Sequence, residues 1–136
     1  KFESYCRSLA SSGHELYIVA GPLGSGGTGT NGPAHSISGP SSTGGTMTVN
    51  VPVSTWKVAI VLPNGSNDVS RVTSSTRAIG IVIPNSDSAV TQSTGWGGFR
   101  VKIRDIEAQT GFNVFSKVPQ SVQGAIETKV DNGPTQ

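Results

Sequence analysis

The 136-residue chain is short of cysteine, histidine, charged residues and long apolar runs. Its single cysteine, Cys6, excludes a disulfide within the chain, and its two histidines do not make the Cys/His spacing typical of a metal site. No stretch of eighteen apolar residues is present, so we expect neither a membrane span nor a membrane partner. No signal peptide is recognisable, although one could have preceded the abrupt start at Lys1.

Charged residues make up only 13% of the chain, against roughly 25% in ordinary soluble domains. Eighteen glycines and many Ser, Thr and Asn residues take their place, and such a neutral polar surface is more typical of exported proteins. The net charge of +2 permits a polyanionic partner without requiring one, because strongly basic nucleic-acid binders carry far more excess positive charge.

The order of apolar patterns predicts one α+β domain over residues 1–136, with a largely antiparallel sheet flanked by helices. The expected elements are a helix over 1–10, a buried strand over 15–22, strands over 54–63 and 77–85, and helices near 103–111 and 119–129. Residues 24–47 show no apolar periodicity and are rich in Gly and Ser. We expect a flexible surface insertion there.

The first helix has one apolar face, on which Phe2, Tyr5, Cys6 and Leu9 recur at i, i+3, i+4 and i+7. Cys6 on this face is best interpreted as a small buried hydrophobic residue. If a second chain packs against the helix, Cys6 could instead face a partner cysteine.

Glu3 and Arg7 lie four residues apart on the same helix. With Phe2 at the centre of the apolar face, they fall about 100° and 140° around the helix, at the border of the buried stripe. On spacing alone, an ordinary i, i+4 ion pair worth a few tenths of a kcal/mol explains the two residues. The alternative is that they are part of a functional site.

Three further motifs favour ordinary structural interpretations. The glycine-rich GSGGTG at 24–29 matches a phosphate-binding pattern, but no helix follows it, so we expect a mobile loop. His14 and His35 have no positioned partner in sequence and are expected to be solvent-exposed. Asn64 begins an Asn-Gly-Ser glycosylation acceptor, which matters only in a eukaryotic secretory route.

Six stretches, taken in order, resemble the DNA/RNA non-specific endonucleases of the ββα-metal superfamily, especially the cyanobacterial and related bacterial secreted enzymes. They are FESYCRSLA, GHELYIVAGP, VPVSTWKVAIVL, TRAIGIVIPN, VKIRDIEAQTGFNVFSKVP and VQGAIETKVD. The resemblance runs nearly end to end, except for 24–47 and parts of 64–76 and 86–97. It implies a ββα-metal endonuclease fold of which residues 1–136 are the C-terminal part, completed by a second chain.

The resemblance also implies roles for two residues. Glu3 matches the family's helix glutamate, which orders water around a magnesium ion. Arg7 matches the arginine one turn later, which contacts the scissile phosphate or the leaving group. The family's Asp-Arg-Gly-His motif, with its general-base histidine, and the asparagine that binds Mg²⁺ directly do not occur in these 136 residues. We therefore expect the N-terminal part of the nuclease to be present as a second polypeptide.

The reaction implied is Mg²⁺-dependent hydrolysis of DNA and RNA phosphodiesters to 5′-phosphate ends. Composition and family favour a secreted or periplasmic location, with a mitochondrial one as the weaker alternative. Two other classes of function remain open. One is a catalytically inactive module that binds nucleic acid or an inhibitor partner. The other is a purely structural or surface-interaction domain.

Overall fold

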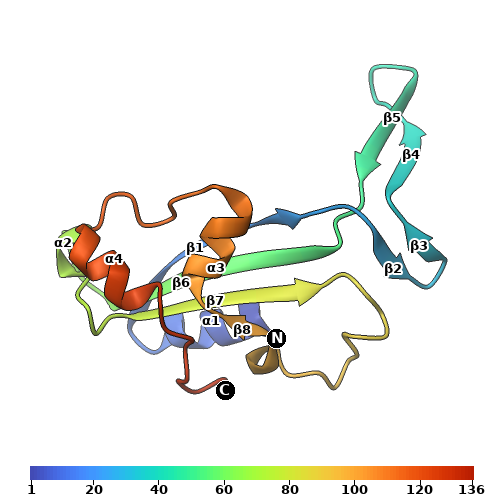
Figure 1. Ribbon diagram of the computed structural model, residues 1–136. Helices are drawn as coiled ribbons and strands as arrows, with labels where there is room; N and C mark the ends of the chain where they lie inside the picture. The colour runs from blue at the N-terminus through green and yellow to red at the C-terminus, as the bar shows by residue number, and fades with distance from the viewer.

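A four-stranded antiparallel sheet in the order β1-β6-β7-β8 organises the chain in the computed structural model, which describes residues 1–136 (Figure 1). Helices flank this sheet, so the predicted α+β class is confirmed. The strands of the sheet are β1 (His14–Leu23), β6 (Ser54–Pro63), β7 (Arg77–Pro84) and β8 (Arg100–Val101). The helices are α1 (Phe2–Ser11), α2 (Asp68–Arg71), the 3₁₀ helix η1 (Trp96–Phe99), α3 (Ile103–Thr110) and α4 (Gln120–Ile126).

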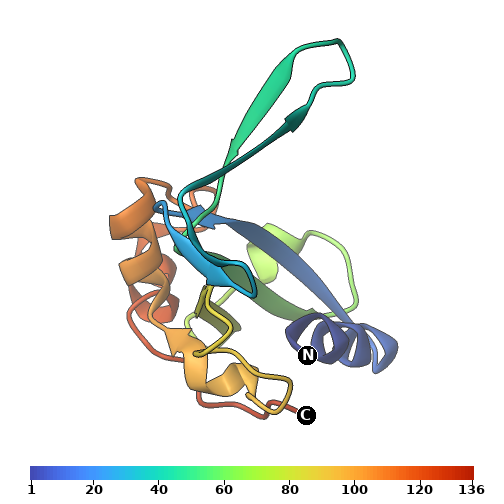
Figure 2. The same cartoon turned by 90° about the vertical axis from the view of Figure 1, so that its right-hand side faces the viewer.

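The central strand β6 is buried on both faces. On one face, Trp56, Val58, Ile60 and Leu62 join a cluster completed by residues of α3 and α4. On the other face, its intervening apolar residues pack under α1. Figure 2 shows α1 and the α3–α4 region on opposite sides of the sheet. The alternation predicted for this strand is confirmed, and burying each large apolar side chain contributes about 1.5–3 kcal/mol.

Helix α1 packs through the apolar face that its sequence predicts. Phe2, Tyr5 and Cys6 are buried against the sheet and against Trp96 of η1. Cys6 is a free thiol, and burial raises its pKa. The interpretation of Cys6 as a small buried hydrophobic residue is confirmed.

Helix α3 lies directly on the backbone of β7 at Gly80. A Cβ atom at this position would lie 3.0 Å from Ile103 Cγ1 and 3.0 Å from the carbonyl oxygen of Val101. Glycine therefore lets the helix approach the strand closely. At its other end, α3 stops at Gly111, whose φ of 75° forms the left-handed C-terminal cap that the sequence predicts.

Strand β1 is not the buried strand that its continuous apolar run predicts. It pairs only with β6 and forms one edge of the sheet. Tyr17, Ile18 and Val19 are 53%, 46% and 47% exposed. A continuous apolar run indicates burial on both faces, but in this chain no neighbouring element covers the outer side of the strand.

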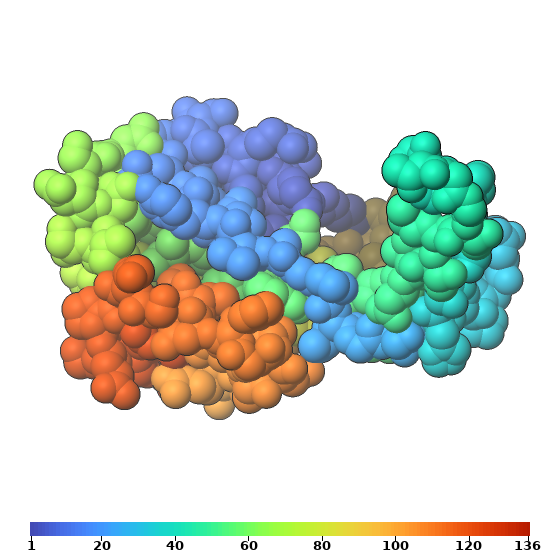
Figure 3. Space-filling view, turned by 90° about the horizontal axis from the view of Figure 1, so that it is seen from above, coloured from blue at the N-terminus to red at the C-terminus, as the bar shows by residue number.

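Residues 24–47 fold into strands, which the sequence did not indicate. They contain β2 (Gly27–Gly29), β3 (Gly32–Ala34), β4 (Ser36–Pro40) and the start of β5 (Thr46–Asn50), paired as two short hairpins. The β4–β5 hairpin projects from the body of the molecule (Figures 1 and 3). Strands of three to five residues are too short to give a clear period, and β2 contains two glycines in three residues. The flexibility of this insertion stays a prediction.

Three shorter elements were also not predicted, namely α2, η1 and β8. Each has two to four residues, which is too short for a periodic pattern. Helix α4 ends at Ile126 and does not continue to Lys129 as its spacing suggested.

The C-terminal segment is held to the sheet by a buried carboxylate. Asp131, whose side chain is 5% exposed, accepts hydrogen bonds from Arg77 at 2.8 Å and from Arg100 at 3.1 Å. Burial by itself would raise the pKa of Asp131, but these hydrogen bonds hold it below its ordinary value. Nearby, Trp96 Nε1 donates to the carbonyl oxygen of Thr135 at 3.1 Å.

Glu127, directly after α4, is a second buried carboxyl group, and its pKa is shifted in the opposite direction from that of Asp131. Its side chain is 1% exposed, and Oε2 accepts a hydrogen bond from Arg104 at 2.7 Å. Its other oxygen, Oε1, is buried without a partner. Burial raises the pKa of Glu127, and the charge of the neighbouring Glu107 adds to this effect.

We predict opposite pH effects for the two buried carboxyl groups. A raised pKa means that Glu127 stabilises the fold while protonated, and that this contribution is lost as pH rises through the raised pKa. In thermal unfolding, Glu127→Gln should therefore be more stable than the parent chain by about 1 kcal/mol near pH 8, and equal to it at acid pH.

Asp131→Asn is the matched comparison, because the lowered pKa of Asp131 means that its contribution is lost only as pH falls through that pKa. This variant should be destabilised by about 3 kcal/mol near neutral pH, and the difference should narrow only under strongly acid conditions. The same pH dependence for both variants would contradict the assignment.

Candidate functional site

Glu3 and Arg7 both lie on the exposed side of α1, at the border of its buried face. Glu3 is in the first turn, and its side chain is 55% exposed. It does not pair with Arg7. Its carboxylate accepts a hydrogen bond from Lys57 Nζ, which also lowers the pKa of Glu3 and keeps it ionised at neutral pH. The i, i+4 ion pair that spacing alone favoured is therefore absent.

Lys57 was not identified from the sequence. It belongs to β6 and lies on the face that carries Ala59 and Val61 under α1. The sequence did carry a signal for it, because Lys57 is the only charged residue in the strand segment STWKVAIVL. Only the packing of α1 on the sheet brings Lys57 to Glu3, from 54 residues away.

Arg7 has no carboxylate partner. Its Nη2 donates to Ser4 Oγ at 3.2 Å. The other four arginines all pair with carboxylates: Arg71 with Glu15 and Asp68, Arg77 and Arg100 with Asp131, and Arg104 with Glu127. Arg7 is thus the one exposed guanidinium of the chain that is free to receive an anion such as a phosphate.

The residues at this site fit an indirect role toward a divalent cation. No group of three or more His, Cys, Asp or Glu side chains comes together anywhere in residues 1–136. Glu3 is a single ionised, exposed carboxylate, which suits hydrogen bonding to the water around an ion and cannot form a coordination sphere by itself. The other positions around a Mg²⁺ ion would be filled by water, by substrate oxygens or by ligands from outside residues 1–136.

The two histidines are not brought to Glu3 or Arg7. His14 is half-buried at the start of β1 and lies 3.3 Å from Ser12 Oγ, whereas full exposure was expected. His35 is exposed, as predicted, and packs beside Gly26 in the projecting insertion. The GSGGTG segment runs from the end of β1 into β2 and does not begin a helix, so it lacks the helix N-terminus that a phosphate-binding loop requires.

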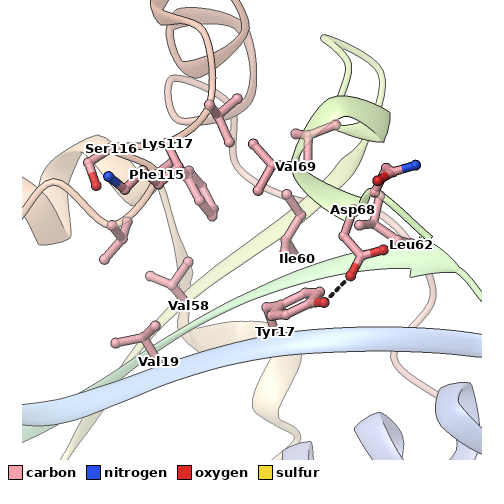
Figure 4. Close-up of a pocket in the computed structure, with 14 residues that line it drawn as sticks. Tyr17, Val19, Val58, Ile60, Leu62, Asp68, Val69, Phe115, Ser116 and Lys117 are labelled. Atoms are coloured by element: carbon pink, nitrogen blue, oxygen red, sulfur yellow. Dashed lines mark hydrogen bonds between the residues drawn. The ribbon is translucent and has the colours of Figure 1, made fainter. Parts of the chain in front are cut away.

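An apolar groove of about 510 Å³ runs beside β1 on the face opposite α1 (Figure 4). Tyr17 and Val19 form one wall, and the Tyr17 hydroxyl donates to Asp68 of α2. The floor is the apolar face of β6, and the far wall is the segment 114–118 that follows α3. The sequence predicted neither this groove nor the exposed edge of β1 beside it.

No helix of the structure is both long and apolar enough to cross a bilayer.

Comparison with known proteins places the chain among nucleases. The family model for DNA/RNA non-specific endonucleases matches residues 1–121. A curated relative, a nuclease of Nostoc sp. (strain PCC 7120), is 38% identical over 130 residues. This match covers 96% of the present chain and 41% of the Nostoc protein, so the chain spans about two fifths of its relative's length.

A solved structure agrees at the level of the fold. A chain in the crystal structure of the EndoG/EndoGI complex, which concerns the mechanism of EndoG inhibition, superposes with a TM-score of 0.54 at 18% identity. The superposition covers 87% of the present chain and 43% of that chain. At this identity the likeness supports the shared fold alone.

Proposed function

The chain belongs to the DNA/RNA non-specific endonuclease family, and on that premise we propose that it supplies part of the active site of a Mg²⁺-dependent endonuclease. The enzyme would hydrolyse phosphodiesters of DNA and RNA to 5′-phosphate ends, and this chain would be active only together with the N-terminal part of the nuclease. The observation that carries the proposal is the unpaired Arg7 one helical turn from the ionised Glu3.

The two side chains have complementary tasks. Consecutive turns of a helix are about 5.4 Å apart, a distance that suits one group facing a hydrated cation and the other facing a phosphate. The carboxylate of Glu3 would accept hydrogen bonds from water around the ion and so orient it. The guanidinium of Arg7 would bind two phosphate oxygens and stabilise the negative charge that builds on them during hydrolysis. A bound Mg²⁺ would supply Lewis-acid polarisation of the phosphate.

Broad substrate acceptance follows from the kind of contact. Arg7 would bind the phosphate backbone, which DNA and RNA share, and phosphate contacts carry no sequence information directly. The β2–β5 insertion is an unsuitable phosphate ligand, because residues 16–56 contain no Lys or Arg at all. Substrate would therefore approach the α1 side of the molecule and not the projecting hairpin.

The direct metal ligand and the general base would come from the N-terminal part, which we propose is a second polypeptide. The Asp-Arg-Gly-His motif of the family does not occur in residues 1–136, so its histidine would have to come from outside them. The groove beside β1 and the unpaired edge of that strand offer a surface for the second polypeptide to extend the sheet. The low charge content favours a secreted or periplasmic location, with a mitochondrial one less favoured.

We predict that Arg7→Ala, assembled with the N-terminal part, loses Mg²⁺-dependent plasmid nicking by about 10²–10³-fold, because the transition-state charge loses its guanidinium. Lys129→Ala, which removes one exposed positive charge elsewhere, should retain activity. A loss of only a few-fold in binding, with no nicking by the parent assembly, would identify the chain as an inactive nucleic-acid- or partner-binding module. Absence of any salt-dependent affinity for nucleic acid would indicate a purely structural domain.

We also predict that Val19→Asp prevents assembly, because it places a charge on the exposed wall of the groove beside β1. Native mass spectrometry should detect the parent chain with its N-terminal partner and the Val19→Asp chain as a lone 14.0 kDa species. Val49→Asp is the matched control, since Val49 is equally exposed but lies on the β4–β5 hairpin. Equal assembly of all three chains would rule out this groove as the interface.

A further inference from the structure

We propose that Lys57 is a positioning residue of the nuclease site, which holds the Glu3 carboxylate away from Arg7 and so leaves Arg7 free for phosphate. This inference rests on the proposed function and adds a residue to it. The observation behind it is that Glu3 pairs with Lys57, on a different element, and not with the arginine four residues further along its own helix.

Lys57 is held in a rigid part of the molecule. It lies in the central strand β6, directly opposite Ala20 of β1 and Ile81 of β7. Ile81 is fully buried, and the Lys57 side chain is only 25% exposed. The aliphatic part of the lysine is therefore packed against the sheet, while its ammonium group reaches the solvent at the edge of α1. A side chain restrained in this way has little rotamer freedom left to lose when it fixes a partner.

The competition for Glu3 explains why such a residue matters. Glutamate followed by arginine at i, i+4 on a helix is a favourable pairing, and without another partner the two side chains would associate. That pairing would occupy both groups that the proposed reaction needs. An ammonium group on β6 removes the competition, since it binds the carboxylate and leaves the guanidinium with only the Ser4 hydroxyl.

Lys57 differs from the other cations of the chain in what it contacts. Arg71 binds carboxylates of β1 and α2, Arg77 and Arg100 bind Asp131 of the C-terminal segment, and Arg104 of α3 binds Glu127 at the end of α4. None of them contacts α1 through a carboxylate. Lys57 is the one cation that pairs with a carboxylate of α1, and that carboxylate is the proposed site residue.

The test uses the nuclease assembled from this chain and its N-terminal part, with Lys57→Met, Lys57→Gln and Lys57→Arg as variants. Loss of the positioning cation should lower kcat by about 10–100-fold and weaken Mg²⁺ binding, measured by calorimetry, by a similar factor. Lys57→Arg should restore most of both. Lys129→Met, which removes an exposed lysine outside the site, should change neither. If Lys57→Met does not fold, Lys57→Gln replaces it in the activity and Mg²⁺-binding measurements.

A second readout follows Arg7 directly. In nitrogen NMR of the assembled protein, the Arg7 guanidinium should rotate freely in the parent. In Lys57→Met it should rotate slowly, because it is then paired with Glu3.

Unchanged activity and metal binding in Lys57→Met would overturn the inference. An increase in KM alone would also overturn it, because Lys57 would then be a direct phosphate ligand. An Arg7 NMR signal that is the same in the parent and in Lys57→Met would overturn it as well. An inactive parent assembly would instead refute the proposed function itself.

Discussion

Burial of β6 on both faces is the constraint from which the other elements take their positions. One face receives α3 and α4, and the other receives α1, so two apolar clusters share a single strand. Because the side chains of a strand alternate between its faces, each layer is matched to one set of alternate residues in STWKVAIVLP. A shift of one residue in the pairing of this strand would exchange the two sets, which would place Lys57 in the cluster under α3 and α4 and Trp56 under α1.

The proposed site is a consequence of the same strand. The face of β6 that packs under α1 carries Val61, Ala59 and then Lys57, so the series passes from apolar to charged at the point where the first turn of α1 lies above it. Glu3 meets the charged member of this series. The helix is therefore fixed by its apolar residues, and the position of its carboxylate is fixed by the lysine.

The β1 edge of the sheet is exposed and apolar. Strand β1 presents unpaired backbone and exposed Tyr17, Ile18 and Val19, beside a groove lined mainly by apolar side chains. Exposed apolar edges of this kind are usually paired or covered in folded proteins. In the proposed assembly, the uncovered edge of β1 would receive the second polypeptide, and α1 would contribute Glu3 and Arg7 to the active centre.

The sequence by itself determined the elements with a strong period: α1, the two faces of β6, β7, and α3 with its glycine cap. In these segments local spacing and burial agree, so the pattern of residues is sufficient. It did not reveal the hairpins between β1 and β6, because strands of three to five residues are too short to show a clear period. It also indicated the wrong environment for β1, because an apolar run does not say whether a neighbour is present to cover it. For the site, the sequence identified Glu3 and Arg7 only through a family resemblance, and spacing alone paired them with each other. Only the tertiary structure brought Lys57 to Glu3, because contacts between residues 54 positions apart depend on how a helix packs on a sheet, which no local pattern records.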